Sequence, residues 1–142
     1  MMKRMTKIVF IALFMLVPSV VSAEDNVQTT GFDWEPVMDA IIQVESNGNP
    51  NARSGSSCGA MQITPILVKE CNQILKRKKS KKRFTLRDRF SVAKSKEMFL
   101  LIQSYFNPAN NIEKAIRSWN GGMNYSVKRT QRYFEKVMRA MK

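Results

Sequence analysis

The stretch from Asp33 to Pro50 constrains the fold most, because it predicts an amphipathic helix with well-defined ends. Its apolar residues recur every three or four positions, which is the spacing of one buried helix face. Asp33 is a suitable N-cap and Pro36 fits the first turn. Asn47, Gly48 and Pro50 end the helix. The buried face comprises Trp34, Val37, Met38, Ile41 and Ile42, and the next position on it is Glu45.

Glu45 therefore places a carboxylate on the inner side of this helix, in its last turn. Partial burial disfavours the charged form, and the carboxyl end of a helix carries a partial negative charge. Both effects raise the pKa of the carboxyl group and favour a protonated acid near neutral pH, as general acid catalysis requires. The alternative is a half-exposed residue that ends the apolar face and pairs with a lysine or arginine.

Residues 1–23 have the pattern of a secretory signal peptide. Three basic residues precede an apolar run over residues 8–17, and small residues lead to a cleavage site after Ala23. The run is short for a membrane span, so an uncleaved anchor is the less favoured alternative. We expect an exported protein, periplasmic or associated with the cell wall, that meets the membrane only transiently, through this segment. Residues 24–32 are then a polar tether, and residues 33–142 form one domain.

Charge and composition limit both the partners and the chemistry. Cleavage after Ala23 removes three basic residues and no acidic ones, so the net charge falls from +13 to +10. Outside the cytoplasm this charge favours envelope polymers and anionic lipid headgroups, and not nucleic acid. The chain has no histidine, which excludes Ser-His and Cys-His catalysis and His-ligated zinc. Carboxylate chemistry remains, and we expect no metal and no cofactor.

Cys58 and Cys71 are the only cysteines. An exported chain meets an oxidising compartment, where a disulfide that closes this loop would contribute about 3 kcal/mol to stability. We therefore predict a disulfide. The alternative is a pair of reduced, buried thiols.

The rest of the chain predicts further helices and no confident strand. The loop over residues 47–59 could form a small hairpin before residues 59–63, which read GAMQI. Thr64 and Pro65 begin a second helix, and the longest helix spans residues 86–106. A fourth helix closes at residues 120–122, and the last runs over residues 126–141. The candidates for the inner face of the longest helix are Phe90, Ala93, Met98, Leu101, Ile102 and Tyr105. The fold class is all-α, or mainly α.

Residues 76–83 read KRKKSKKR and are basic at every position but one. Because the charges repel one another, this run predicts an exposed loop or a frayed helix end. A solvated connector is favoured over a dedicated binding site. No stacking aromatic residues interrupt the run, which argues against a nucleic-acid surface.

Four short blocks, taken in order, resemble the soluble lytic transglycosylase family. These are lysozyme-like enzymes that cut the glycan strands of peptidoglycan. The resemblance covers residues 34–137 and implies a compact helical domain with a cleft. The blocks are Glu45-Ser46, GAMQI at residues 59–63, Ser118-Trp119-Asn120 followed by Gly121, and the segment from Thr130 to Tyr133.

By this resemblance Glu45 is the catalytic acid. It protonates the glycosidic oxygen between N-acetylmuramic acid and N-acetylglucosamine, then deprotonates the C6 hydroxyl, which closes a 1,6-anhydro ring. This mechanism needs one carboxylate where ordinary glycosidases need two. The residues that the resemblance places around the sugar and the acid are Ser46, Met61, Gln62, Trp119, Asn120 and Tyr133.

Several of these positions have a structural alternative. Met61 could equally be core, and the amide of Gln62 could bond to backbone. Asn120 could be an ordinary helix cap. For Tyr133, core packing is compatible with a hydroxyl at the acid. Trp119 departs from the family, which usually has tyrosine there, so a surface for the sugar is kept and a hydroxyl is lost.

Asp39 and Glu135 are the nearest candidates for a second carboxylate, and surface ion pairs are the expected role of both. Two other functions stay open: a hydrolytic muramidase of the same fold, and a non-catalytic wall-binding or assembly protein held by the basic run. The small size favours recruitment by a partner, such as a secretion, conjugation or pilus apparatus, and we expect a monomer.

Overall fold

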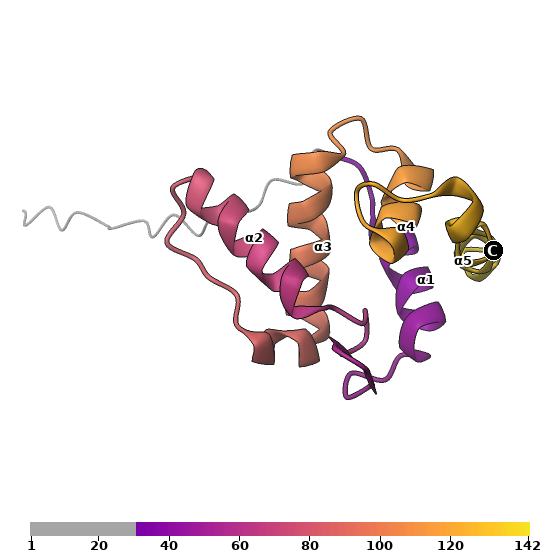
Figure 1. Ribbon diagram of the computed structural model, residues 1–142, viewed down its shortest axis with the longest axis horizontal. Coiled ribbons are helices and arrows are strands. Elements are labelled where there is room, and N and C mark those ends of the chain that lie inside the picture. Colours follow the sequence, from indigo (N-terminus) through magenta and orange to yellow (C-terminus); the bar gives the residue numbers. More distant parts are fainter. Residues whose placement is uncertain (1–30) are drawn as a thin grey trace, which may run out of the picture.

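The computed structural model describes residues 31–142, so the expected signal peptide and most of the tether lie outside the described residues. The described chain is mainly helical, as the sequence predicts, with one two-stranded sheet (Figure 1). No helix in this part of the chain has the length and apolar character needed to cross a membrane. The helices are α1 (Glu35–Ser46), α2 (Pro65–Arg77), η1, a 3₁₀ helix (Leu86–Phe90), α3 (Val92–Phe106), α4 (Ile112–Gly121) and α5 (Val127–Ala140).

Helix α1 buries the face that its spacing predicts. Trp34, Val37, Met38 and Ile41 are core residues, and Ile42 is partly buried. The N-cap is Trp34 and not Asp33, although Asp33 Oδ1 still accepts the N–H of Glu35 at 3.0 Å. At the other end Asn47 adopts a left-handed conformation with φ 52°, which stops the helix as predicted.

The helices form two groups that share one core. Helices α1, α4 and α5 pack together, and α2 packs on α3 (Figure 1). Phe99 of α3 packs against both groups. The centroid of its ring lies 5.6 Å from that of Trp34 and 5.2 Å from that of Trp119. Between the groups lies the predicted hairpin, formed by β1 (Arg53–Ser54) and β2 (Ser57–Cys58).

The prediction of one long helix over residues 86–106 is wrong, because the chain breaks at Ser91. Thr85 and Asp88 form a capping box that closes a separate turn, η1. Ser91 is extended, and its hydroxyl accepts the N–H of Lys94, so it starts α3 afresh. This new start also corrects the predicted inner face. Met98, Leu101 and Ile102 are buried, Phe90 is partly buried, and Ala93 and Tyr105 are exposed.

The predicted disulfide is also wrong, because Cys58 and Cys71 are free, buried thiols. Cys71 lies on the face of α2 that meets α3, and its Sγ donates to the carbonyl oxygen of Met98 at 3.8 Å. Cys58 pairs through its backbone with Ile63. Burial, followed by the nearby charge of Glu70, raises the pKa of the Cys71 thiol to about 12. At neutral pH it is therefore a thiol and a poor nucleophile.

The basic run ends α2 and continues as a loop. Asn72 fixes this loop, because its amide donates to the carbonyl of Phe84 at 2.8 Å and accepts the Phe84 N–H at 2.7 Å. The Phe84 ring is buried beneath the loop. Lys82 pairs with Glu97 of α3. The loop is thus more than a solvated connector, although Lys78, Lys79 and Lys81 remain exposed.

Candidate active site

Glu45 lies in the last turn of α1 and is half-buried, as its place on the apolar face predicts. Burial is the main effect on its carboxyl group and raises the pKa above the ordinary value. The hydroxyl of Tyr133 acts in the opposite direction, because it stabilises the charged form. The direction of the shift confirms the prediction from sequence.

Tyr133 comes from α5, which packs against α1. Burial and the nearby charge of Glu45 raise the pKa of this phenol, so it stays protonated. Within residues 31–142 the buried hydroxyl has no hydrogen bond of ordinary geometry. The hydroxyl lies close enough to affect the pKa of Glu45, and no other group uses its proton among the described residues. This pair is the centre of the site.

The turn that carries GAMQI is attached to the end of α1 by Ser46. The Ser46 hydroxyl donates to the carbonyl of Ala60 at 2.7 Å and lies 3.1 Å from that of Ile42. Its hydrogen is used inside the protein, so the structure gives this residue a structural role, and its predicted contact with the sugar stays a prediction. This bond fixes the position of the turn relative to the end of α1, which carries Glu45.

The two predicted site residues in the turn itself take their structural alternatives. Met61 has 0% exposed surface, which matches its core alternative. The side-chain amide of Gln62 donates to the carbonyls of Gly59 at 2.9 Å and Ala52 at 3.2 Å. Only its oxygen is left for a substrate.

Arg89 holds this turn from the other side, and sequence reasoning missed it. Its guanidinium is buried and donates to the carbonyls of Ser56 at 3.0 Å and Ile63 at 3.3 Å. Gly59 crosses directly over η1, where an added Cβ would lie 1.7 Å from the carbonyl oxygen of Arg89. No spacing in the sequence distinguishes this arginine from its basic neighbours.

Trp119, in α4, is attached to the same turn. Its indole N–H donates to the carbonyl oxygen of Met61 at 3.1 Å, and its ring packs on Phe99. The tryptophan that stands in place of the expected tyrosine therefore bonds to the backbone of this turn. Asn120 is exposed in the last turn of α4, whose C-cap is Gly122, so the helix-cap alternative for Asn120 is wrong.

Trp119 and Asn120 line a groove of about 530 Å³ between α4 and α2. Glu45, Gln62 and Tyr133 are not among its lining residues. The groove and the acid are connected through the GAMQI turn, to which Trp119 binds at Met61 and Ser46 binds at Ala60. Ser46, the GAMQI turn and Trp119 are thus linked by hydrogen bonds, whereas the acid and the groove do not share lining residues.

A model of the transglycosylase SLT domain family matches residues 25–140. The chain belongs to this family. No curated protein and no solved structure matches it. Membership of this family implies the lysozyme-like fold. At the level of the family it also implies a function of the lytic transglycosylase type, which acts on peptidoglycan.

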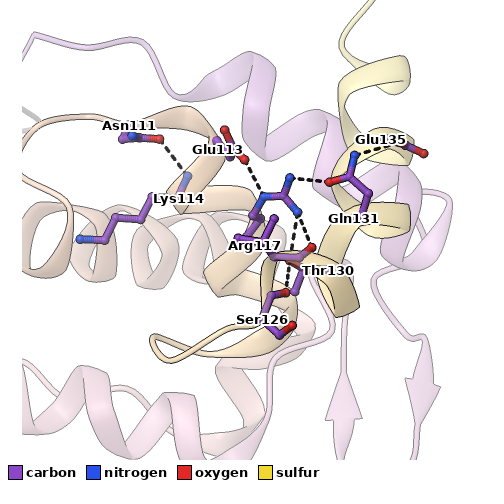
Figure 2. A network of polar contacts seen from close by, with 9 residues as sticks. Asn111, Glu113, Lys114, Arg117, Ser126, Thr130, Gln131 and Glu135 are labelled. Atoms are coloured by element: carbon purple, nitrogen blue, oxygen red, sulfur yellow. Dashed lines mark hydrogen bonds and ion pairs between the residues drawn. The ribbon is translucent and has the colours of Figure 1, made fainter.

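Arg117 fixes the helix that presents Tyr133 in this SLT domain (Figure 2). It is buried, and its guanidinium donates to Glu113 Oε1 at 2.8 Å, Thr130 Oγ1 at 3.2 Å and Gln131 Oε1 at 2.7 Å. It also donates to the carbonyl of Val127 at 2.9 Å. Its only sequence signal, Glu113 four residues earlier, is that of an ordinary surface pair.

The two candidates for a second carboxylate lie elsewhere on the SLT domain. Asp39 forms an ion pair with Lys96 at 2.9 Å, which confirms the predicted surface pair. Glu35 shares the same lysine at 2.6 Å. Glu135 instead accepts a hydrogen bond from Gln131 at 2.9 Å.

Proposed function

We propose that this SLT domain cleaves the bond between N-acetylmuramic acid and N-acetylglucosamine and leaves 1,6-anhydro ends, with Glu45 as acid and base. One observation carries the proposal. The half-buried carboxyl group of Glu45 has a raised pKa beside the Tyr133 hydroxyl, which lacks any other partner within residues 31–142. A raised pKa lets a carboxyl group keep its proton to a higher pH than an ordinary glutamate and donate it to a leaving group.

In the first step protonated Glu45 gives its proton to the glycosidic oxygen, and the bond to the anomeric carbon breaks. Glu45 is then a carboxylate, which the Tyr133 hydroxyl stabilises by donating to it. In the second step this carboxylate takes the proton of the C6 hydroxyl, and the C6 oxygen attacks the anomeric carbon. The ring closes, and Glu45 is protonated again for the next cycle.

The surroundings of Glu45 favour this route over hydrolysis. A hydrolytic muramidase needs a second carboxylate to position water or to act as nucleophile. Asp39 is occupied by Lys96, and Glu135 by Gln131. A non-catalytic wall-binding protein would have no need of a half-buried carboxyl group with a raised pKa beside a tyrosine hydroxyl.

We also propose that the chain is exported after cleavage behind Ala23 and works in the periplasm or at the cell wall. The pattern of residues 1–23 and the net charge of +10 that remains support this location.

Digestion of purified sacculi by the wild type and by Glu45→Gln tests the reaction. We expect the wild type to release anhydro ends, lighter than reducing ends by one water, about 18 Da in mass spectrometry. The variant should lose activity by about a hundredfold or more, because the amide has no acidic proton. Asp39→Asn is the control and should keep full activity.

Each other outcome points to a different function. Reducing ends from the wild type would identify a hydrolase. Unchanged turnover by Glu45→Gln would remove Glu45 from the mechanism. Binding of sacculi without any cleavage by the wild type would favour the wall-binding protein.

A further inference from the structure

Glu70 is the one charged side chain among the described residues that line the groove beside Trp119. It lies on α2 and is partly exposed. The ion pairs of residues 31–142 use Glu35, Asp39, Glu97 and Glu113, and none uses Glu70. The groove therefore holds an uncompensated negative charge.

The rest of the groove favours a cation as well. Trp119 and Phe106 contribute aromatic rings, whose faces attract ammonium groups. The rim is apolar, because the side chains of Ile66 and Met123 are 80% and 41% exposed. Such a rim suits an aliphatic chain that leads to the charged group. A neutral sugar could stack on Trp119 but would leave the charge of Glu70 uncompensated.

We infer that this groove binds an amine-bearing side chain of the peptide stems attached to the glycan, with Glu70 as the partner of the ammonium group. The inference rests on the proposed function, because a peptide stem arrives only with a peptidoglycan strand. Glu70 is then a specificity residue and takes no part in bond cleavage. The groove and the acid are attached to one turn, so a stem held at Glu70 positions its strand relative to Glu45.

Equilibrium binding to the full mature chain carrying Glu45→Gln tests this inference without any turnover. The probes are peptidoglycan fragments whose stems carry a free primary amine, and the same fragments after acetylation of that amine. We expect about five- to tenfold tighter binding of the free amine at low salt, because one charge pair and one cation–π contact are lost on acetylation. The preference should shrink at high salt.

The substitution Glu70→Gln, added to Glu45→Gln, should abolish the preference and leave the fold unchanged by circular dichroism. Glu135→Gln in the same background is the charge-matched control and should keep the preference, because Glu135 lies on α5 away from the groove. Equal binding of both probes, no binding of either, or a preference that survives Glu70→Gln would overturn the inference. Absence of cleavage by the wild type would overturn only the proposed reaction, because this measurement does not depend on turnover.

Discussion

At the scale of single residues, the site depends on the carboxyl group of Glu45. Neighbouring residues in the sequence predict only part of its environment. The place of Glu45 on the apolar face of α1 predicted its burial, and burial is the main cause of its raised pKa. The hydroxyl that lowers this pKa comes from Tyr133, 88 positions later in the chain. Helical spacing places a residue on a face, but it does not say which distant side chain meets it.

The raised pKa of Glu45 predicts how stability depends on pH. The folded state binds this proton more tightly than the unfolded chain, whose value is near 4.5. The contribution of Glu45 is therefore fully present below the unfolded pKa and is lost as the pH rises through the folded pKa. Glu45→Gln has no such proton to lose, so its Tm should exceed that of the wild type at pH 7 and converge with it near pH 4. Thermal unfolding at several pH values checks this, and a difference independent of pH would contradict it.

At the scale of elements, the turn between β2 and α2 positions the acid and the groove together. Ser46 of α1, Trp119 of α4 and Arg89 of η1 all bond to backbone in or next to this turn. Of the six residues predicted to contact sugar or acid, Ser46, Met61 and Gln62 are parts of this scaffold, and Trp119 both bonds to it and lines the groove. Residue type could not separate the two roles, because a hydroxyl, a thioether or an amide serves protein and sugar alike.

Gly59 is the position where this scaffold tolerates no side chain. Its φ is +82°, and a Cβ would lie 1.7 Å from the carbonyl oxygen of Arg89, which is backbone and cannot rotate away. Gly59→Ala should lower the free energy of unfolding by about 2–4 kcal/mol, from backbone strain together with overpacking. Urea unfolding measures this loss.

Gly48→Ala is the matched control for this substitution. Its φ is +81°, but nothing lies within 4 Å of an added Cβ. Only the backbone cost of about 1 kcal/mol should remain. Equal losses from the two substitutions would show that the approach of Arg89 has no energetic effect.

At the scale of the whole molecule, part of the positive charge of the described chain lies on one exposed loop. Lys78, Lys79 and Lys81 are exposed on the loop after α2. Lys82, in contrast, pairs with Glu97, so that lysine belongs to the fold. A cationic loop attracts anionic wall polymer over a distance set by the salt concentration.

Replacing Lys78, Lys79 and Lys81 with Gln should weaken binding to purified sacculi severalfold at about 10 mM salt and have little effect at about 1 M, where the Debye length falls to about 3 Å. Sedimentation with sacculi measures the bound fraction. Replacing Lys128, Arg129 and Arg132 on the exposed side of α5 removes the same charge and is the control. An equal loss in both variants would mean that net charge alone drives binding.

The sequence by itself determined the mainly helical fold, the helix that carries Glu45, the hairpin before GAMQI and the order of the four blocks. These features follow from local spacing, capping and turn residues, which act over a few positions. The tertiary structure decided the free state of Cys58 and Cys71, the break at Ser91, the burial of Met61 and the buried networks of Arg89 and Arg117. Each of these depends on which surfaces meet across the core. Packing between segments far apart in the chain determines these contacts, and local sequence patterns do not predict it.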